Sequence, residues 1–354
     1  MTKKIKVLIV DDSALIRQML TAMLSKDPGI EVVGAAPDPL TARTMIKQLN
    51  PDVLTLDIEM PRMDGIAFLE KIITLRPMPV VMISSLTQEG ADIAMQALEM
   101  GAVDYIAKPT SDLRLGLEAK GAEIISKVKT AANARVMARK PIPQATMENT
   151  VLQRFKTTEQ VVCIGASTGG VEAIREVICQ LPPNFPGVLI TQHMPGKFTT
   201  SFANRMNTIT RVTVCEAQHN QRILPGHVYI APGEHHLEIN RSGANYICRL
   251  TDEAPVSGHR PSVDVLFNSA AKVAGANAIG VILTGMGRDG AEGMLKLRQA
   301  GAFTIGQDEP SCVVYGMPKV AFETGGVQQQ APLSKIAGLL MQYLESKDMK
   351  AIRI

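Results

Sequence analysis

The sequence predicts an α/β protein with two doubly wound parallel-sheet domains joined by a linker. Strand-like and helix-like segments alternate over residues 1–125, as the crossover connections of parallel strands require. The alternation is lost over residues 126–157, and it resumes over residues 158–354. A chain of 354 residues is also long for one domain, which favours two.

The first half contains five short apolar segments that we expect to be strands, and a helical pattern follows each of them. The expected strands are residues 6–10, 31–35, 53–57, 80–84 and 104–107, and the expected helices are residues 14–24, 39–48, 65–75, 90–100 and 112–127. This order predicts a flavodoxin-like fold, in which helices cover both faces of a parallel sheet.

Residues 126–157 have the composition of a linker, with seven Lys and Arg residues against one acid and a Pro-Ile-Pro segment. The first part of this stretch can extend the preceding helix. The strands expected beyond it are residues 161–165, 188–192, 211–216, 228–231, 278–284 and 303–305. A helix is expected over residues 171–181, directly after the first of these strands.

Composition excludes several classes of function. A net charge of +3 and the absence of Trp argue against nucleic-acid binding. The apolar run near the N-terminus is too short for a signal peptide, and no run is long enough to span a bilayer, so we expect a cytoplasmic protein. The five cysteines include no C-x-x-C pair, which indicates reduced core residues rather than disulfides or a zinc site.

Ser167 is the candidate nucleophile, because it follows a buried strand and precedes a helix in the glycine-rich segment GASTGG (165–170). Backbone N–H groups at such a junction favour developing negative charge. The structural alternative is that Ser167 only caps its helix. The segment also fits the G-x-S-x-G elbow of α/β-hydrolases, but that fold requires a histidine after the acid, and no histidine follows Asp289.

A serine nucleophile needs a base and a group that orients the base. His193 and Asp289 follow two other expected strands, so three strand ends can present Ser167, His193 and Asp289 to one site. The glycine-rich loop 285–290 can direct backbone N–H groups toward an oxyanion. The alternatives are that His193 is an ordinary loop histidine and that Asp289 caps the helix expected to start at Gly290. Should Ser167 prove dispensable, Ser262 and Thr284 are the next candidates.

An acidic cluster is expected in the first half. Asp11 and Asp12 follow the first strand, Asp57 ends the third, and Lys108 follows the fifth. Carboxylates gathered at one sheet edge repel one another, and Mg²⁺ would remove that cost. Lys108 could pair with an incoming phosphoryl group. Solvated loop acids are the alternative explanation.

The first half resembles a response-regulator receiver domain along its whole length. The resemblance is carried by the segments VDDS (10–13), LDIEMPRMDG (56–65), SS (84–85) and YIAKP (105–109). It implies that Asp57 accepts a phosphoryl group, with Mg²⁺ held by Asp11, Asp12, Asp57 and the carbonyl of Glu59. It also implies that Ser84 and Tyr105 act as switch residues.

The whole chain resembles the CheB family of chemotaxis protein-glutamate methylesterases and glutamine deamidases. Beyond Ser167, the resemblance is carried by QHMP (192–195), YIAPG (229–233), HRPSVD (259–264) and TGMGRDG (284–290). It implies Ser167 as nucleophile, His193 as base and then acid, and Asp289 as the orienting carboxylate. The Met286 N–H and Thr168 would support the oxyanion, and hydrolysis would need no cofactor.

The resemblance also implies partners. Chemoreceptors would be the substrate and a chemotaxis histidine kinase the phosphodonor, so contact with the membrane would occur only through receptors. We expect a monomer in which the unphosphorylated receiver inhibits the catalytic domain. Two other classes compete with this reading: a DNA-binding response regulator, and a docking protein in which Ser167 only caps a helix.

Overall fold

The structure is a computed structural model that describes residues 3–60, 64–85, 87–108, 120–134 and 159–351. The chain forms two compact units, Met1–Pro141 and Ile142–Ile354, and each is described separately. The predicted helix over 112–127 and the predicted linker over 126–157 lie partly outside the described residues.

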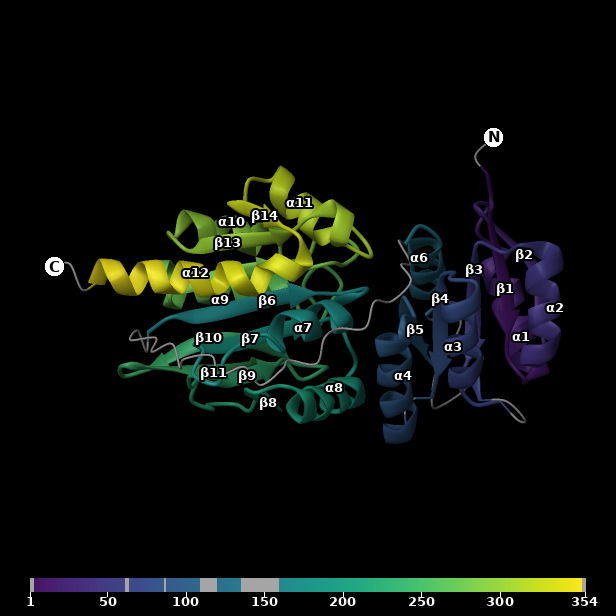
Figure 1. Ribbon diagram of the computed structural model, residues 1–354, viewed down its shortest axis with the longest axis horizontal. Coiled ribbons are helices and arrows are strands. Elements are labelled where there is room, and N and C mark those ends of the chain that lie inside the picture. The colour runs from purple at the N-terminus through teal and green to yellow at the C-terminus, as the bar shows by residue number, and fades with distance from the viewer. Residues whose placement is uncertain (1–2, 61–63, 86, 109–119, 135–158, 352–354) are drawn as a thin grey trace. The chain divides into compact units, whose positions relative to one another are not determined.

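The N-terminal unit is a five-stranded parallel sheet with the strand order β2-β1-β3-β4-β5 (Figure 1). This order is the flavodoxin-like one, and it confirms the predicted fold class. Its strands are β1 (Ile5–Val10), β2 (Ile30–Ala36), β3 (Val53–Asp57), β4 (Val80–Ser84) and β5 (Asp104–Ala107). Its helices are α1 (Ala14–Leu24), α2 (Pro39–Leu49), α3 (Gly65–Leu75), α4 (Gln88–Met100) and α6 (Gly121–Ala132).

Short polar side chains begin the first four helices of this unit. The side chains of Ser13, Asp38, Asp64 and Thr87 each accept a hydrogen bond from a backbone N–H in the first turn of the helix that follows. Such caps satisfy N–H groups that have no partner within the helix. The predicted helix boundaries agree with the structure to within two residues for α1 to α4, and α6 continues to Ala132.

The C-terminal unit is built on a seven-stranded parallel sheet with the order β14-β13-β12-β6-β7-β9-β8. The sheet strands are β6 (Val161–Ala166), β7 (Gly187–Gln192), β8 (Thr213–Glu216), β9 (His227–Ile230), β12 (Ala278–Ile282), β13 (Phe303–Gln307) and β14 (Gln329–Ala331). The helices are α7 (Gly170–Ile178), α8 (Gly196–Ile209), α9 (Val263–Val273), α10 (Ala291–Gln299), α11 (Met317–Glu323) and α12 (Leu333–Ala351), with short 3-10 turns at Gly275–Asn277 and Glu309–Ser311.

Three strands of this unit were not predicted. β10 (His236–Ser242) and β11 (Asn245–Thr251) form a separate antiparallel hairpin, and β14 is an edge strand. The outer end of β10 is polar and exposed, whereas Tyr246 and Cys248 of β11 are buried, so the hairpin mixes apolar and polar residues without a long apolar run. The predicted strand 278–284 is also too long, because β12 ends at Ile282 before the chain turns toward the site.

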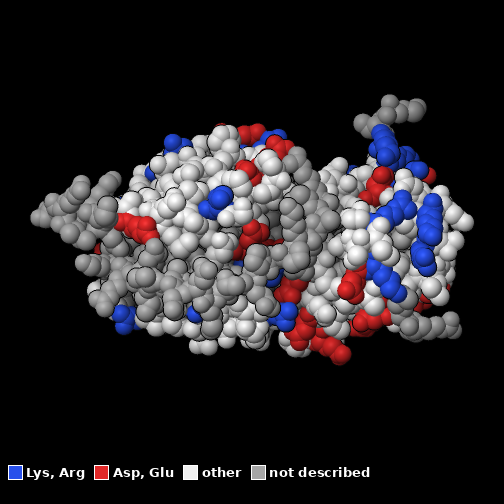
Figure 2. All heavy atoms as spheres, in the orientation of Figure 1, with Lys and Arg blue, Asp and Glu red and all other residues white. Residues whose placement is uncertain are grey.

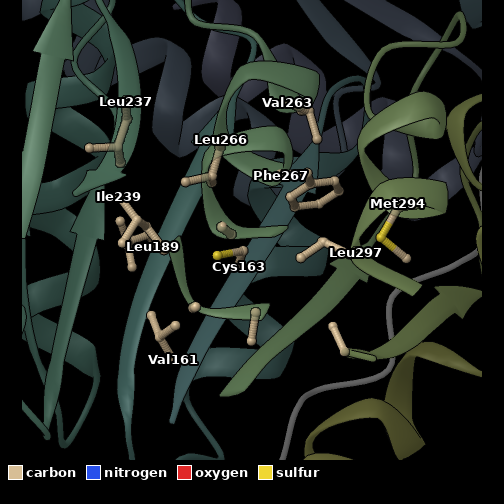
Figure 3. Close-up of a cluster of buried hydrophobic side chains, with 14 of the residues drawn as sticks. Val161, Cys163, Leu189, Leu237, Ile239, Val263, Leu266, Phe267, Met294 and Leu297 are labelled. Atoms are coloured by element: carbon tan, nitrogen blue, oxygen red, sulfur yellow. The ribbon is translucent and has the colours of Figure 1, made fainter. Parts of the chain in front are cut away.

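The core of the C-terminal unit holds α9 in place (Figure 3). Leu266 and Phe267 of α9 pack with Cys163 of β6 and with Leu237 of the hairpin, and all four side chains are fully buried. Burying each such apolar side chain stabilises the fold by about 1.5–3 kcal/mol. All five cysteines are free, as their spacing predicted. The packing of α9 matters because its first turn contacts the candidate site.

The described surface carries charges of both signs, as expected for a chain with 37 Lys and Arg residues and 34 Asp and Glu residues. Figure 2 shows basic and acidic side chains of the N-terminal unit close to one another on the face in view. Within the described ranges, no helix combines the length and the apolar character that crossing a membrane requires.

Candidate active site

The candidate catalytic residues follow three adjacent strands of the seven-stranded sheet. β6 lies between β12 and β7, and Ser167, His193 and Asp289 come after β6, β7 and β12 respectively. The chain proceeds outward from β6 to β7 on one side and returns on the other side as β12. Ligand sites of open α/β sheets collect at such a switch point, beyond the carboxyl ends of the strands.

Ser167 is held by its backbone, which leaves its side chain to the site. Its N–H donates to the Thr284 carbonyl over 3.0 Å, and its own carbonyl accepts from Gly170 N–H over 2.7 Å. The residue that caps α7 is Gly169, and no side chain caps that helix. The reading of Ser167 as a helix cap is therefore wrong.

His193 connects Ser167 to Asp289. Its Nδ1 lies 3.2 Å from Oγ of Ser167, and its Nε2 lies 2.8 Å from Oδ2 of Asp289. The carboxylate assigns the ring proton to Nε2, so Nδ1 presents a lone pair to the serine hydroxyl. These ring positions are the reverse of those in the chymotrypsin triad, where Nε2 faces the serine. The His193 side chain is 7% exposed, which shields this chain of hydrogen bonds from water.

Asp289 is a buried carboxylate that accepts hydrogen bonds from the first turn of α9. Ser262 Oγ and Val263 N–H donate to it over 2.8 and 2.7 Å, and Asp264 N–H over 3.1 Å. Burial raises its pKa, but the His193 ring and these donors outweigh burial and lower the pKa of Asp289 to about 2. Asp289 therefore caps α9, which is spatially adjacent, and the reading that it caps the following helix is wrong because Gly290 occupies that position.

The first turn of α9 packs closely against the site because Gly165 and Gly290 leave room for the Val263 side chain. A Cβ added at Gly165 would lie 2.2 Å from Cγ1 of Val263, and one added at Gly290 would lie 2.5 Å from the same atom. Gly290 also has φ +90°, which favours glycine. Val263 therefore occupies a notch that only glycines leave open, and this brings the start of α9 against the carboxyl end of β6.

The two fallback candidates are engaged elsewhere. Ser262 Oγ donates to Asp289, and the single hydroxyl proton of Thr284 faces the carbonyls of Thr168 and Val314, which lie 3.0 and 3.2 Å from Oγ1. Ser167, in contrast, has the base that a nucleophile needs, because Nδ1 of His193 contacts its Oγ.

The N-terminal unit gathers three carboxylates at the carboxyl edge of its own sheet. Oxygen atoms of Asp11, Asp12 and Asp57 lie within 4.8 Å of one another. Lys108 Nζ donates to Asp57 over 2.7 Å and lies 3.5 Å from Asp11. Asp57 and Asp11 are buried, whereas Asp12 is exposed.

The pKa of Asp57 in this cluster shifts in the opposite direction from that of Asp289. Burial and then the charge of Asp11 raise the pKa of Asp57 to about 6, although Lys108 lowers it in part. Oδ2 of Asp11 is buried, and its cationic neighbour, the Lys108 ammonium at 3.5 Å, is too distant for a good hydrogen bond. A set of close carboxylate oxygens with so weakly paired a buried member suits a hard divalent cation such as Mg²⁺.

The residues expected to act as a switch lie on β4 and β5 of the same sheet. Ser84 ends β4, and its hydroxyl donates to the Gly90 carbonyl over 2.7 Å. Tyr105 is buried on β5, with Nζ of Lys127 4.9 Å above its ring. Glu59 accepts a hydrogen bond from Ser85 Oγ through its side chain, and its N–H contributes a hydrogen bond to Asp57.

Family models match both units of the chain. The family model described as "CheB methylesterase" matches residues 162–340, and the model described as "Response regulator receiver domain" matches residues 7–120. The chain belongs to the CheB methylesterase family.

Curated relatives match the CheB-family chain over its whole length. A protein-glutamate methylesterase/protein-glutamine glutaminase of Methylobacillus flagellatus is 56% identical over 353 residues, covering 99% of each chain. One of Geobacter metallireducens is 54% identical over 363 residues, covering 100% of this chain and 99% of the relative. The crystal structure of the Thermotoga maritima CheB methylesterase catalytic domain matches 52% of this chain and 98% of its own, with 38% identity and a TM-score of 0.51.

The oxyanion residues expected from the CheB family adjoin Ser167. A Cβ on Gly285, the residue before Met286, would lie 2.8 Å from Cβ of Ser167, so this loop packs directly against the nucleophile. Met286 is 40% exposed, and Thr168 is buried next to Ser167. Because the Ser167 N–H is bonded to Thr284, the oxyanion needs donors from other residues.

Sequence reasoning missed several side chains that support this CheB-family site. Gln192 Nε2 donates to the Ser167 carbonyl over 2.9 Å, and the His259 ring stacks on His193. In the receiver unit, an Arg17 nitrogen donates to the carbonyls of Asp11 and Asp12, both over 2.8 Å. Gln192 and His259 lie within two of the motifs that carried the family resemblance. Membership in those motifs was the signal that could have marked them as site residues.

Proposed function

We propose that this chain is a protein-glutamate methylesterase and protein-glutamine glutaminase that acts on chemoreceptors by a Ser-His-Asp mechanism. The observation that carries the proposal is the hydrogen-bonded series from Ser167 through His193 to the buried carboxylate of Asp289. The names of relatives that are more than half identical along the full chain support the substrate class.

The geometry suits acyl transfer. Nδ1 of His193 takes the proton of Ser167 as Oγ attacks the glutamyl ester carbonyl, and Asp289 stabilises the imidazolium that forms. The intermediate collapses as the C–O bond to methoxide breaks and Nδ1 returns the proton, releasing methanol. Water, activated by the same nitrogen, then hydrolyses the acyl-serine to a glutamate. With a glutamine substrate, ammonia leaves in place of methanol.

The oxyanion of each tetrahedral intermediate needs donors beside Ser167. We assign this role to the Met286 N–H with support from Thr168, because the loop that begins at Gly285 packs against the nucleophile. Loss of one such donor lowers the rate by about 10²–10³-fold.

The N-terminal unit would serve as a phosphorylation switch. Asp57 would accept a phosphoryl group from a histidine kinase, and Lys108 would pair with the added charge. Asp11, Asp12, Asp57 and the Glu59 carbonyl would hold Mg²⁺, which offsets the negative charge of the incoming group. Ser84 and Tyr105 would respond to the phosphoryl group, and the protein would work in the cytoplasm as a monomer.

The unphosphorylated receiver would inhibit the catalytic unit, and phosphorylation would shift the population toward an active arrangement. The motivation is the presence of a phosphorylation cluster and a serine site in one chain. Deleting residues 1–140 should raise the basal rate of methanol release. A truncated enzyme that is no faster than the unphosphorylated full chain would contradict the inhibition.

The deciding experiment measures methanol release from methylated chemoreceptor membranes, with and without a phosphodonor. Ser167→Ala should abolish release while Asp57 still takes up phosphate. Ser346→Ala, which changes an exposed serine of α12, is the matched control and should retain full activity. A serine-reactive phosphonate should label the wild type and the Ser346 variant, but not the Ser167 variant. Activity retained without Ser167 would move the nucleophile elsewhere.

The competing classes predict other observations. A DNA-binding regulator needs a compact basic recognition domain, whereas residues 162–340 match a methylesterase model. A docking protein whose serine only caps a helix is inconsistent with Gly169 as the cap of α7.

A further inference from the structure

A second imidazole lies flat against the catalytic one. The rings of His193 and His259 are stacked, with their centroids 3.7 Å apart and their planes 10° apart. Ser167 and Asp289 both bind the edge of the His193 ring, at its two nitrogens. His259 therefore occupies a face of the ring that neither triad partner touches.

The two hydrogen bonds of His193 leave one motion weakly restrained. Because both hydrogen bonds meet the ring at its edge, they restrain motion within the ring plane more than displacement of the ring along its normal. Such a displacement moves the Nδ1 lone pair off Oγ of Ser167, and hydrogen bonds weaken as their angle departs from linear. A parallel ring at van der Waals distance blocks this displacement on its side.

The loop that carries His259 has a defined geometry. Val256 and His259 exchange two backbone hydrogen bonds, of 3.0 and 2.9 Å, which close a tight turn. The two residues inside the turn, Ser257 and Gly258, both have positive φ, 53° and 81°, as a type I′ turn requires. The Arg260 guanidinium then donates to the carbonyls of Asp252 and Glu253 over 3.0 and 3.1 Å, which ties the turn to the end of β11.

The base of the same loop holds Asp289. Buried His236 accepts from the Ser262 N–H at Nδ1, and its Nε2 contacts the Ala254 carbonyl, both over 3.2 Å. This imidazole therefore joins the two ends of residues 254–262. Ser262 Oγ in turn donates to Asp289 over 2.8 Å. One loop thus contacts the carboxylate that orients His193 and supplies the ring that covers its face.

We propose that His259 is a positioning residue for His193, and that its stacked ring holds the Nδ1 lone pair on Ser167. The inference rests on the proposed serine mechanism and deepens it. His259 acts through its flat shape and not by transferring a proton. A planar aromatic side chain should therefore replace it, whereas a small or a branched aliphatic one should not.

The test compares His259→Ala, His259→Leu and His259→Phe in the full-length chain after treatment with acetyl phosphate. Methanol release is measured against the concentration of methylated receptor membranes. Because a misplacement of about 1 Å can cost about 10²-fold in rate, we expect the Ala and Leu variants to lose about 10–10²-fold in kcat with little change in KM. The Phe variant should stay within about fivefold of wild type, since the stack persists.

His227→Ala is the matched control, because His227 begins β9 at the opposite end of the sheet and should leave kcat unchanged. Thermal unfolding of each variant checks that the catalytic unit folds. Ala and Phe variants that are equally slow while folded would overturn the proposal, because shape would then not suffice. A raised KM with normal kcat would overturn it in favour of substrate contact, and an unchanged Ala variant would also overturn it.

The proposed function is tested separately by Ser167→Ala in the same assay. If that variant kept its activity, the serine mechanism would fail irrespective of His259. If it were inactive while His259→Ala matched wild type, only the positioning role would fail.

Discussion

The two units place carboxylates at the same kind of location, the carboxyl edge of a parallel sheet, and give them opposite electrostatics. Asp57 is buried beside another carboxylate, and its pKa rises to about 6. Asp289 is more thoroughly supplied with donors, and its pKa falls to about 2 despite burial. Burial alone therefore does not set the behaviour of a site carboxylate.

The neighbours explain the difference. Asp289 accepts from the first turn of α9, where backbone N–H groups converge and the helix dipole favours an anion. Asp57 has Lys108 as its cationic partner, while Asp11 opposes its charge. A carboxylate kept ionised suits the orientation of an imidazole, and a cluster under mutual repulsion suits the capture of a cation.

The largest expected effect comes from Asp289→Asn. An amide can mimic the carboxylate's shape but not its charge, so we expect methanol release to fall by about 10³–10⁴-fold. The catalytic unit should also lose about 1–3 kcal/mol of its free energy of unfolding at pH 7, since a carboxylate with a lowered pKa contributes stability above its unfolded value. Asp252→Asn, at an exposed carboxylate, is the control. If Asp289→Asn left the free energy of unfolding unchanged, the contrast drawn between Asp289 and Asp57 would be wrong.

A change of opposite sign is expected from Asp57→Asn. Removing one of several repelling carboxylates should raise the free energy of unfolding of the N-terminal unit by about 1–3 kcal/mol at pH 7, measured in urea without Mg²⁺. The variant should lose all stimulation by phosphodonor and keep basal activity. Added Mg²⁺ should stabilise the wild type more than the variant. Destabilisation by this substitution would show that the Lys108 contact outweighs the repulsion.

The smallest effect is expected at Asp264, whose carboxylate accepts from Gly293 N–H over 2.7 Å in the first turn of α10. Asp289, which precedes α10, accepts hydrogen bonds from the first turn of α9, and Asp264, in the first turn of α9, accepts one from the first turn of α10. The two helices therefore cap each other. Burial is the main cause that raises the pKa of Asp264 to about 6, and the charge of Asp289 adds to it.

A raised pKa means that the folded state holds its proton more tightly than the unfolded state. The stability from Asp264 is therefore present below about pH 4 and is lost as pH rises through about 6. Asp264→Asn should remove this loss, which we expect to be on the order of 1–2 kcal/mol between pH 4 and pH 6. Denaturation in urea at a series of pH values measures it. Because Asp57 titrates in the same range, the unfolding of the C-terminal unit is the relevant transition, and an undiminished slope there in the variant would assign the titration to another group.

The sequence by itself determined the two parallel sheets and the strand ends that carry Ser167, His193 and Asp289. Strand periodicity and turn residues are local signals, and the topology of parallel sheets brings carboxyl ends together. The hairpin β10–β11 escaped prediction because it mixes buried apolar residues with polar, exposed ones and has no long apolar run. Its stability comes from packing against α9, which no local pattern reports.

Only the tertiary structure decided how the site residues are held. Sequence reasoning allowed Ser167 and Asp289 to cap the helices that follow them, but Gly169 caps one helix and Asp289 caps α9. The stacking of His259 on His193 joins residues far apart in the chain. The contacts of Asp289 with α9 likewise depend on the close approach of Val263 to Gly165 and Gly290, and close packing is a property of the folded chain rather than of any segment of it.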